Sequence, residues 1–352
     1  MLSGGGARGA YQAGAIAALV QQSGVRDGEP LPSFDVICGS SIGALNGWFV
    51  ATGQYTLLSQ LWQTIGRRNI FALKKRYAAA ANPDSGLLTR IDAALALEIG
   101  LVTHVRGVLD DGHVARWIAQ YIDPTTPILR PFVFTVTNLN HQRGELFYRA
   151  PPGISAQRRA QATRAIELTV GPSVIARPAG NDILQAAIRA SASMPILFDP
   201  VELPGADGNI QDYVDGGIAN NTPVDVARAV TKNVYAILLD PDIANPPRAR
   251  NAIEVGIASF TVTQRRILES ALRAAYLETA AKRATLSRTD SQEARSILGE
   301  IFDCDLYTMR PAAELPVEIV DFTNQGAIDA SYQLGYHDAL AGWQRYKLPI
   351  AP

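Results

Sequence analysis

The chain has 352 residues, and 47% of them are hydrophobic, so it can bury a large core and is not expected to be disordered. Its formal net charge of −1 argues against a nucleic-acid partner, which would require a strongly basic face. No stretch reaches the ~18 to 20 uncharged apolar residues of a membrane span. The two cysteines, Cys38 and Cys304, predict no disulfide framework and fit a reducing compartment.

The first part of the chain alternates glycine-rich turns with short apolar elements. A glycine loop at residues 4–9 precedes residues 10–22, whose apolar positions recur at helical spacing. Residues 34–38 form a short apolar run typical of a strand, and residues 42–52 again have the pattern of a helix. Ser41 is therefore expected on a turn that leads from a strand into a helix.

The rest of the chain continues this alternation. We expect strands at 132–137 and 234–239, helices at 183–193, 222–230 and 255–283 (the last one long or broken), and a loop or hairpin at 203–211. Apolar strands bounded by polar turns are typical of a parallel sheet covered on both faces. The sequence thus predicts a layered α/β fold. Residues 241–250 are the best candidate for a domain boundary, but we do not divide the chain there.

The motif Gly39-Ser40-Ser41-Ile42-Gly43 has the form of a nucleophile elbow. A serine hydroxyl becomes a good nucleophile only when a base takes its proton and a rigid turn exposes its oxygen. The flanking glycines let the strand turn sharply into the helix, and the helix N-terminus favours a developing anion. The alternative interpretation is a tight turn in which the serines only cap the helix.

The opening glycine loop has two possible interpretations. Gly4, Gly6 and Gly9 match the dinucleotide-binding pattern, but that pattern needs an acidic residue where the second strand ends, and here the strand ends in Cys38. An oxyanion hole built from backbone N–H groups fits better, with donors worth ~3 kcal/mol each in the transition state. Arg8 either supports this loop electrostatically or forms a surface salt bridge, and we favour the first role.

Asp215 follows an apolar pair and precedes two glycines, so it is expected on a tight turn at the end of a strand. In isolation this pattern is typical of a hairpin turn, but together with Ser41 and the glycine loop it indicates a carboxylate base. Since an unperturbed carboxylate is a weak base, we expect burial to raise the pKa of Asp215. Asp212 is the nearest alternative carboxylate.

The four histidines are His104, His113, His141 and His337, and none of them lies in a motif. Only His337 follows Asp215 in the order serine, acid, histidine of the α/β-hydrolases, and its surroundings indicate the polar side of an amphipathic helix. The sequence contains no metal-binding motif, so neither a metal nor another cofactor is implied.

Taken together, these motifs resemble those of the patatin-like phospholipase family. The matching stretches are residues 3–11, 39–46, 189–195 and 215–223, and their order and spacing agree over residues 1–240. The resemblance implies a three-layer α/β/α sandwich with a mostly parallel central sheet. Residues 1–240 would form the catalytic core, and residues 241–352 a mainly helical C-terminal region that completes the same domain.

The resemblance also assigns the site residues. They are the nucleophile Ser41 and the base Asp215 of a Ser–Asp dyad, the elbow glycines Gly39 and Gly43, and an oxyanion hole of Gly4, Gly5, Gly6 and Arg8. The sequence departs from the family in two places. Only Met1, Leu2 and Ser3 precede the glycine loop, so its first strand is very short or upstream residues are absent, and the C-terminal region matches weakly.

The implied function is that of a cofactor-free lipid acyl hydrolase of the phospholipase A or lysophospholipase type. It would cleave the carboxylic esters of phospholipids or other acyl-ester lipids through an acyl-serine intermediate. Two alternatives stay open: a Ser-His-Asp esterase using Ser41 and His337 on soluble esters, and a non-catalytic lipid- or nucleotide-binding module. We expect a cytoplasmic protein with transient contact to a membrane surface, and an export signal lost upstream of Met1 stays open.

The segment 67–77 carries five basic residues and no acidic one, interleaved with apolar side chains. The alternative is a solvated helix face with a few core anchors. Basic groups contribute about 1 kcal/mol each near an anionic surface, so the hypothesis tested is that this segment docks on anionic membranes and gates the Ser41 pocket. A variant with all five basic residues changed to Gln should lose co-sedimentation with anionic vesicles while it keeps activity on soluble esters. Unchanged vesicle binding and unchanged activity on vesicles would exclude this role.

Overall fold

The computed structural model describes residues 1–67, 74, 107–155, 157, 175–242, 248–249, 252–288, 291 and 303–348. In these residues the helices are α1 (Gly9–Ser23), α2 (Ile42–Ala51), α3 (Tyr55–Trp62), α6 (Asp111–Tyr121), α8 (Leu184–Ser191), α9 (Gly217–Asn220), α10 (Val224–Val230), α11 (Ala252–Leu286) and α13 (Gln325–Ala341). The strands are β1 (Ile37–Ser40), β2 (Phe132–Asn138), β3 (Arg143–Arg149), β4 (Ile175–Pro178), β5 (Val201–Pro204), β6 (Ile210–Asp215), β7 (Asn233–Ile237), β8 (Asp305–Met309) and β9 (Gln344–Arg345).

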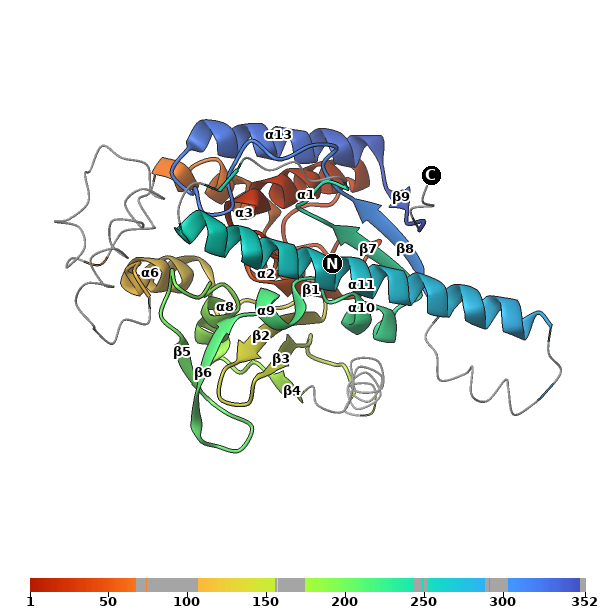
Figure 1. Cartoon of the computed structure of the whole chain (residues 1–352), viewed down its shortest axis with the longest axis horizontal. Helices are drawn as coiled ribbons and strands as arrows, with labels where there is room; N and C mark the ends of the chain where they lie inside the picture. The colour runs from red at the N-terminus through yellow and green to blue at the C-terminus, as the bar shows by residue number, and fades with distance from the viewer. Residues whose placement is uncertain are drawn as a thin grey trace.

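The strands form a sheet with two parts, one of six strands in the order β4-β3-β2-β6-β5 with β1 also paired to β2, and one of three strands in the order β7-β8-β9. Helices surround both parts (Figure 1). Strand β2 is buried along its whole length, and its successive side chains enter two different core clusters. Phe132, Phe134 and Val136 pack in the cluster that includes residues of α1, α2, α3, α6, α8 and α13, whereas Val133 packs with residues of α10 and α11. The expected α/β sandwich is therefore confirmed.

The sheet contains both parallel and antiparallel pairs. β1 runs parallel to β2, β3 to β4 and β7 to β8, whereas the pairs β2–β3, β2–β6, β5–β6 and β8–β9 are antiparallel. Short turns join β2 to β3 and β5 to β6, and such turns can connect only antiparallel neighbours. The sheet is thus mixed, and the expectation that it would be mostly parallel is met only in part.

A single residue at the start of the chain connects two parts of this sheet. Leu2 forms parallel bridges to Gly39 of β1 and to Ile237 of β7. Its N–H donates to the carbonyl of Cys38, and the N–H of Ser3 donates to the carbonyl of Ile237. Leu2 thus joins β1 and β7, and the glycine loop follows Ser3.

Most elements expected from the sequence are present with small shifts at their ends. Helix α1 ends at Gly24 in the left-handed conformation, the expected loop or hairpin at 203–211 is the hairpin β5–β6, and the expected long or broken helix is the continuous α11. Strand β1 begins at Ile37, later than expected. The elements not expected from the sequence are α3, α6, α9, β3, β4, β8, β9 and the full length of α13. None of the helices in the described ranges has the length and apolarity needed to span a membrane.

Helices α1 and α13 lie side by side and are in close backbone contact (Figure 1). A Cβ at Gly14 would lie 1.8 Å from the carbonyl oxygen of Tyr332, and a Cβ at Gly335 would lie 1.9 Å from that of Tyr11. Glycine at these two positions therefore sets the distance between the helices. Since Ile328 of α13 belongs to the core cluster that contains α1, residues after 240 help to build the same core.

We expect Gly335→Ala to destabilise the protein by about 1–3 kcal/mol, because the new methyl group would push two backbones apart. The matched control is Gly256→Ala in α11, where a Cβ would meet no heavy atom within 4 Å. This control should gain up to about 1 kcal/mol, since alanine is the better helix former. Urea denaturation of both variants measures the difference, and a Gly335→Ala protein as stable as the wild type would disprove the close contact.

Candidate active site

Ser41 and Asp215 meet because two strands end on the same edge of β2. Strand β1 runs parallel to β2, and its last residue, Ser40, pairs with Thr135. Strand β6 runs in the opposite direction, and its last residue, Asp215, pairs with the adjacent Val136. The Ser41 Oγ–H donates a hydrogen bond to Asp215 Oδ2 at 2.6 Å. These residues are only 6% and 1% exposed, so the pair is well shielded from bulk water.

The backbone at Ser41 has a conformation that residues other than glycine rarely adopt. Its φ is 51° and its ψ is −125°, and it is followed directly by α2. The Ser41 N–H donates to Ser191 Oγ at 3.0 Å, and Ser191 Oγ in turn donates to the carbonyl of Thr135 at 2.7 Å. This chain of bonds from α8 to β2 holds the strained turn in place. Strain of this kind is typical of a nucleophile elbow.

The two glycines that flank Ser41 are required by close backbone contacts. A Cβ at Gly39 would lie 2.3 Å from the carbonyl oxygen of Gly43. A Cβ at Gly43 would lie 2.3 Å from the carbonyl oxygen of Leu2. The turn is thus packed directly against the segment that leads into the glycine loop.

The buried position of Asp215 changes its acidity. Burial raises the pKa of Asp215 from 3.8 to about 6, although hydrogen bonds from the Ser41 hydroxyl and the Gly217 N–H oppose the increase. The Gly217 N–H donates to Asp215 Oδ1 at 2.7 Å, so each carboxylate oxygen has one donor. The raised pKa expected from the sequence is therefore found, and burial is its cause.

The glycine loop lies beside Ser41, but its N–H groups are not equivalent. The Gly4 N–H donates to the carbonyl of Asn221 at 3.1 Å and is therefore already occupied. For the N–H groups of Gly5 and Gly6 we find no acceptor in the described ranges. Gly6 has a φ of 55° and lines the same cavity as Ser41. Of the expected oxyanion-hole donors, Gly5 and Gly6 are thus available for an oxyanion.

Arg8 binds carboxylates at the outer side of the loop. Its Nη1 lies 2.7 Å from Asp240 Oδ1, and its Nη2 lies 3.5 Å from Glu314 Oε2. All three side chains are partly buried, and Arg8 does not belong to the lining of the cavity that contains Ser41. Its guanidinium therefore connects the glycine loop to the segments that follow β7 and β8.

Ser41 and Asp215 line the same cavity. Its walls are mainly aliphatic and aromatic side chains from α2, α3, α6 and the segments around residues 192–198 and 319–322, with Leu45, Trp62, Trp117, Leu197 and Phe322 as examples. An apolar cavity with a few polar groups at one place is suited to a ligand with a hydrocarbon chain. The hydroxyl and the carboxylate of the pair are at its wall.

The histidines in the described residues are not part of this cavity. His337 is exposed on α13, and neither His113 nor His141 contributes to the lining. His104 lies outside the described residues. In the described ranges there is also no group of three or more His, Cys, Asp or Glu side chains placed to bind a metal ion.

The basic segment expected to contact membranes lies mostly outside the described residues. Of its basic side chains, the structure describes only Arg67 and Lys74. Lys74 Nζ lies 2.8 Å from Asp199 Oδ2, so its charge is already paired with a carboxylate. Membrane contact through this segment stays a prediction from the sequence.

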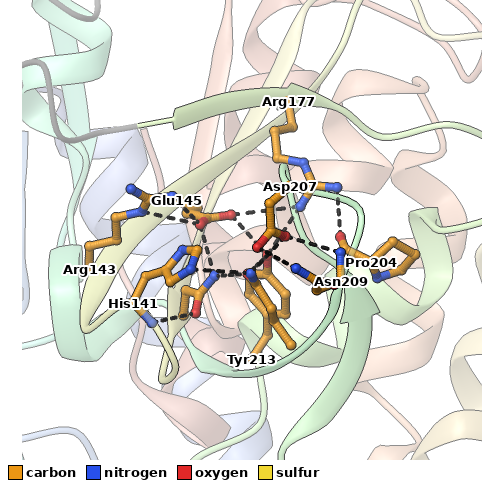
Figure 2. Close-up of polar contacts among 10 residues, drawn as sticks. His141, Arg143, Glu145, Arg177, Pro204, Asp207, Asn209 and Tyr213 are labelled. Carbon is orange, nitrogen blue, oxygen red and sulfur yellow. Dashed lines mark hydrogen bonds and ion pairs between the residues drawn. The ribbon is translucent and has the colours of Figure 1, made fainter.

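A buried cluster around Glu145, which the sequence did not indicate, supports strand β6 (Figure 2). Glu145 is fully buried and accepts hydrogen bonds from Asn138 Nδ2 at 2.9 Å and from the Tyr213 hydroxyl at 3.0 Å. The guanidinium groups of Arg143 and Arg177 lie 3.3 and 3.7 Å from its carboxylate. A buried carboxylate is tolerated only with such partners, and removing one of them is costly.

The same cluster connects the hairpin β5–β6 to the sheet. Figure 2 shows Arg177 reaching from β4 to the carbonyl of Pro204, at 2.7 Å from its Nη2. Gln211 Nε2 donates to Asp207 Oδ1 at 2.9 Å, and burial raises the pKa of Tyr213 to about 12. None of these residues lines the Ser41 cavity, so the cluster positions β6 rather than contacting a ligand. A glutamate in a strand is expected on the solvent side of the sheet, so the burial of Glu145 could not be recognised from the sequence.

Comparison with known proteins gives matches to a family model and to solved structures. A family model described as patatin-like phospholipase matches residues 1–228. Among solved structures, the crystal structure of VipD from Legionella pneumophila matches with a TM-score of 0.37 and 14% sequence identity, covering 98% of this chain and 67% of that chain. No curated protein matches the sequence.

The raised pKa of Asp215 predicts a pH-dependent effect of Asp215→Asn on stability. The folded protein holds the Asp215 proton up to about pH 6, whereas the unfolded chain releases it near 3.8. The wild type therefore loses stability as the pH rises through this window, by about 3 kcal/mol in total. Asparagine has no proton to lose, so the unfolding free energy of the variant relative to wild type should rise by about this amount between pH 4 and pH 7.

Urea denaturation of both proteins at the two pH values measures this difference. The other titrating groups are shared by both proteins and cancel in the comparison. A difference that does not change with pH would show that Asp215 is not held in its protonated form by burial.

Proposed function

This chain belongs to the patatin-like phospholipase family, a family of lipid acyl hydrolases, and we propose that it cleaves carboxylic ester bonds through an acyl-serine intermediate. In this proposal Ser41 is the nucleophile and Asp215 is the general base. The observation that carries the proposal is the 2.6 Å hydrogen bond between these side chains at the wall of an apolar cavity.

In the first step Ser41 Oγ attacks the acyl carbonyl carbon of the lipid. The bond between Oγ and that carbon forms while the hydroxyl proton passes to Asp215 Oδ2. The carbonyl oxygen becomes an oxyanion, for which the N–H groups of Gly5 and Gly6 are the available donors. With a pKa of about 6, Asp215 is ionised at neutral pH and is a stronger base than an ordinary aspartate.

In the second step the tetrahedral intermediate collapses. The bond between the acyl carbon and the alcohol oxygen breaks, and Asp215 returns its proton to that oxygen, leaving the acyl group on Ser41. A water molecule then gives a proton to Asp215 and attacks the acyl-serine. The fatty acid leaves, and the proton goes back to Ser41 Oγ.

The cavity supports a lipid as the substrate, and we propose the phospholipase A or lysophospholipase type. Its mainly apolar lining matches an acyl chain better than the soluble esters of the alternative triad esterase. The triad itself receives no support, because no histidine in the described part of the chain lines the cavity. A strained serine bonded to a carboxylate of raised pKa also favours catalysis over a passive binding module.

We expect Ser41→Ala and Asp215→Asn each to lower turnover of lipid esters by at least about a thousandfold, because the two groups act as one unit. For the same reason the double variant should be hardly worse than either single variant. His337→Ala is the matched control and should keep most activity, since this side chain is exposed on α13.

The assay measures fatty acid release from lipid micelles, with thermal unfolding to show that each variant is folded. A fluorophosphonate probe should label the wild type at Ser41 and leave Ser41→Ala unlabelled. Near-wild-type turnover by Asp215→Asn would exclude the mechanism in which Asp215 is the base. A loss with His337→Ala as large as that with Ser41→Ala would move the protein to the triad class.

A further inference from the structure

Arg189 contributes a cation to the wall of the Ser41 cavity. It lies in the last turn of α8, is partly buried, and lines the cavity together with Ser41 and Asp215. In the described ranges its guanidinium has no hydrogen bond and no ion pair, whereas the buried Arg228 is paired with Glu278. A guanidinium placed between apolar walls without a carboxylate partner is available for an anionic ligand.

The position of Arg189 is linked to that of the dyad through the backbone. The carbonyls of Ser191 and Ser193 accept hydrogen bonds from the N–H groups of Gly216 and Asp215, at 3.1 and 2.9 Å. The Ser193 hydroxyl donates to the Arg189 carbonyl at 2.8 Å. The end of α8 is thus fixed to the turn at Asp215. A ligand bound at Arg189 would therefore be held at a fixed position relative to Ser41 and Asp215.

A second unpaired donor lines the same cavity. Trp117 of α6 contributes to the lining, and its indole N–H is buried without a hydrogen-bond partner in the described part of the chain. Leaving a buried donor unpaired is costly, so an acceptor supplied by a ligand would stabilise this arrangement. The only other charged residue in the described lining is Asp215, whose carboxylate is already bonded to Ser41.

We propose that Arg189 binds the phosphate group of the substrate, with the Trp117 N–H as a further donor. The inference rests on the proposed lipid hydrolysis and makes Arg189 the residue that selects phosphate-bearing lipids over neutral acylglycerols. A guanidinium matches two phosphate oxygens with two parallel N–H groups, and a neutral glycerol hydroxyl offers no such match. In this proposal the apolar cavity binds the acyl chain, and Arg189 binds the phosphate on the alcohol side of the ester.

The first test compares two substrates that share one acyl chain, palmitoyl lysophosphatidylcholine and monopalmitoylglycerol, in the same detergent micelles. Arg189→Gln should lower kcat/KM for the phospholipid about ten- to a hundredfold, as expected for lost hydrogen bonds to a charged group, and leave the neutral ester within about twofold. Arg189→Lys keeps the charge but not the planar fork, so its phospholipid activity should be intermediate. Arg116→Gln, an exposed arginine of α6 outside the cavity lining, is the matched control and should change neither activity.

An equal loss on both substrates would make Arg189 a structural residue, and no loss on either would exclude it from binding; each result overturns the inference. If the wild type hydrolyses neither ester, the proposed function fails, and a binding measurement then decides the role of Arg189 independently. In Ser41→Ala protein, decylphosphocholine should bind more tightly than decyl maltoside, and Arg189→Gln should abolish that preference. Inorganic phosphate at the same concentration should not displace the decylphosphocholine; displacement would show a site for free phosphate and overturn the assignment to a lipid headgroup.

Discussion

Strand β2 carries the constraint on which the candidate site depends, because β1 and β6 approach each other from opposite directions along one of its edges. Their last residues pair with the neighbouring positions Thr135 and Val136. A shift of either strand by one residue would turn its side chains to the other face of the sheet. The geometry of the Ser41–Asp215 pair is therefore a property of the strand register, and the elements that fix this register belong to the site although they do not touch a ligand.

Two features at the site oppose stability, and the surrounding structure holds them in place. Ser41 is kept at a positive φ, and Asp215 is kept as a carboxylate in a place that favours its protonated form. The bonds through Ser191, the packing of Gly43 on Leu2 and the cluster at Glu145 restrain the turn and strand β6. The large core thus holds the strained backbone of Ser41 and the buried carboxylate of Asp215 in place.

The sequence predicted turns and elements that depend on neighbouring residues. It did not predict contacts between residues far apart in the chain. The turn at Ser41 and the position of Asp215 could be predicted because glycines stand at fixed positions next to these residues. Such glycines indicate a close backbone contact, as at Gly43. The pairing of β1 and β6 on one edge of β2 could not, since no local pattern encodes which strands become neighbours. The same limit explains the occupied N–H of Gly4, whose acceptor is Asn221, and the buried Glu145, whose partners come from three other strands.

The glycine loop is completed by residues that follow it by more than two hundred positions. Leu2 joins the sheet through Ile237, and the Ala7 N–H donates to the carbonyl of Ile319. During synthesis the N-terminal end leaves the ribosome first, yet these partners become available only when most of the chain has emerged. A nascent chain that already contains Ser41 therefore lacks the contacts that hold the glycine loop. The glycine loop beside Ser41 therefore reaches its final position only late in synthesis, after residue 319 has emerged.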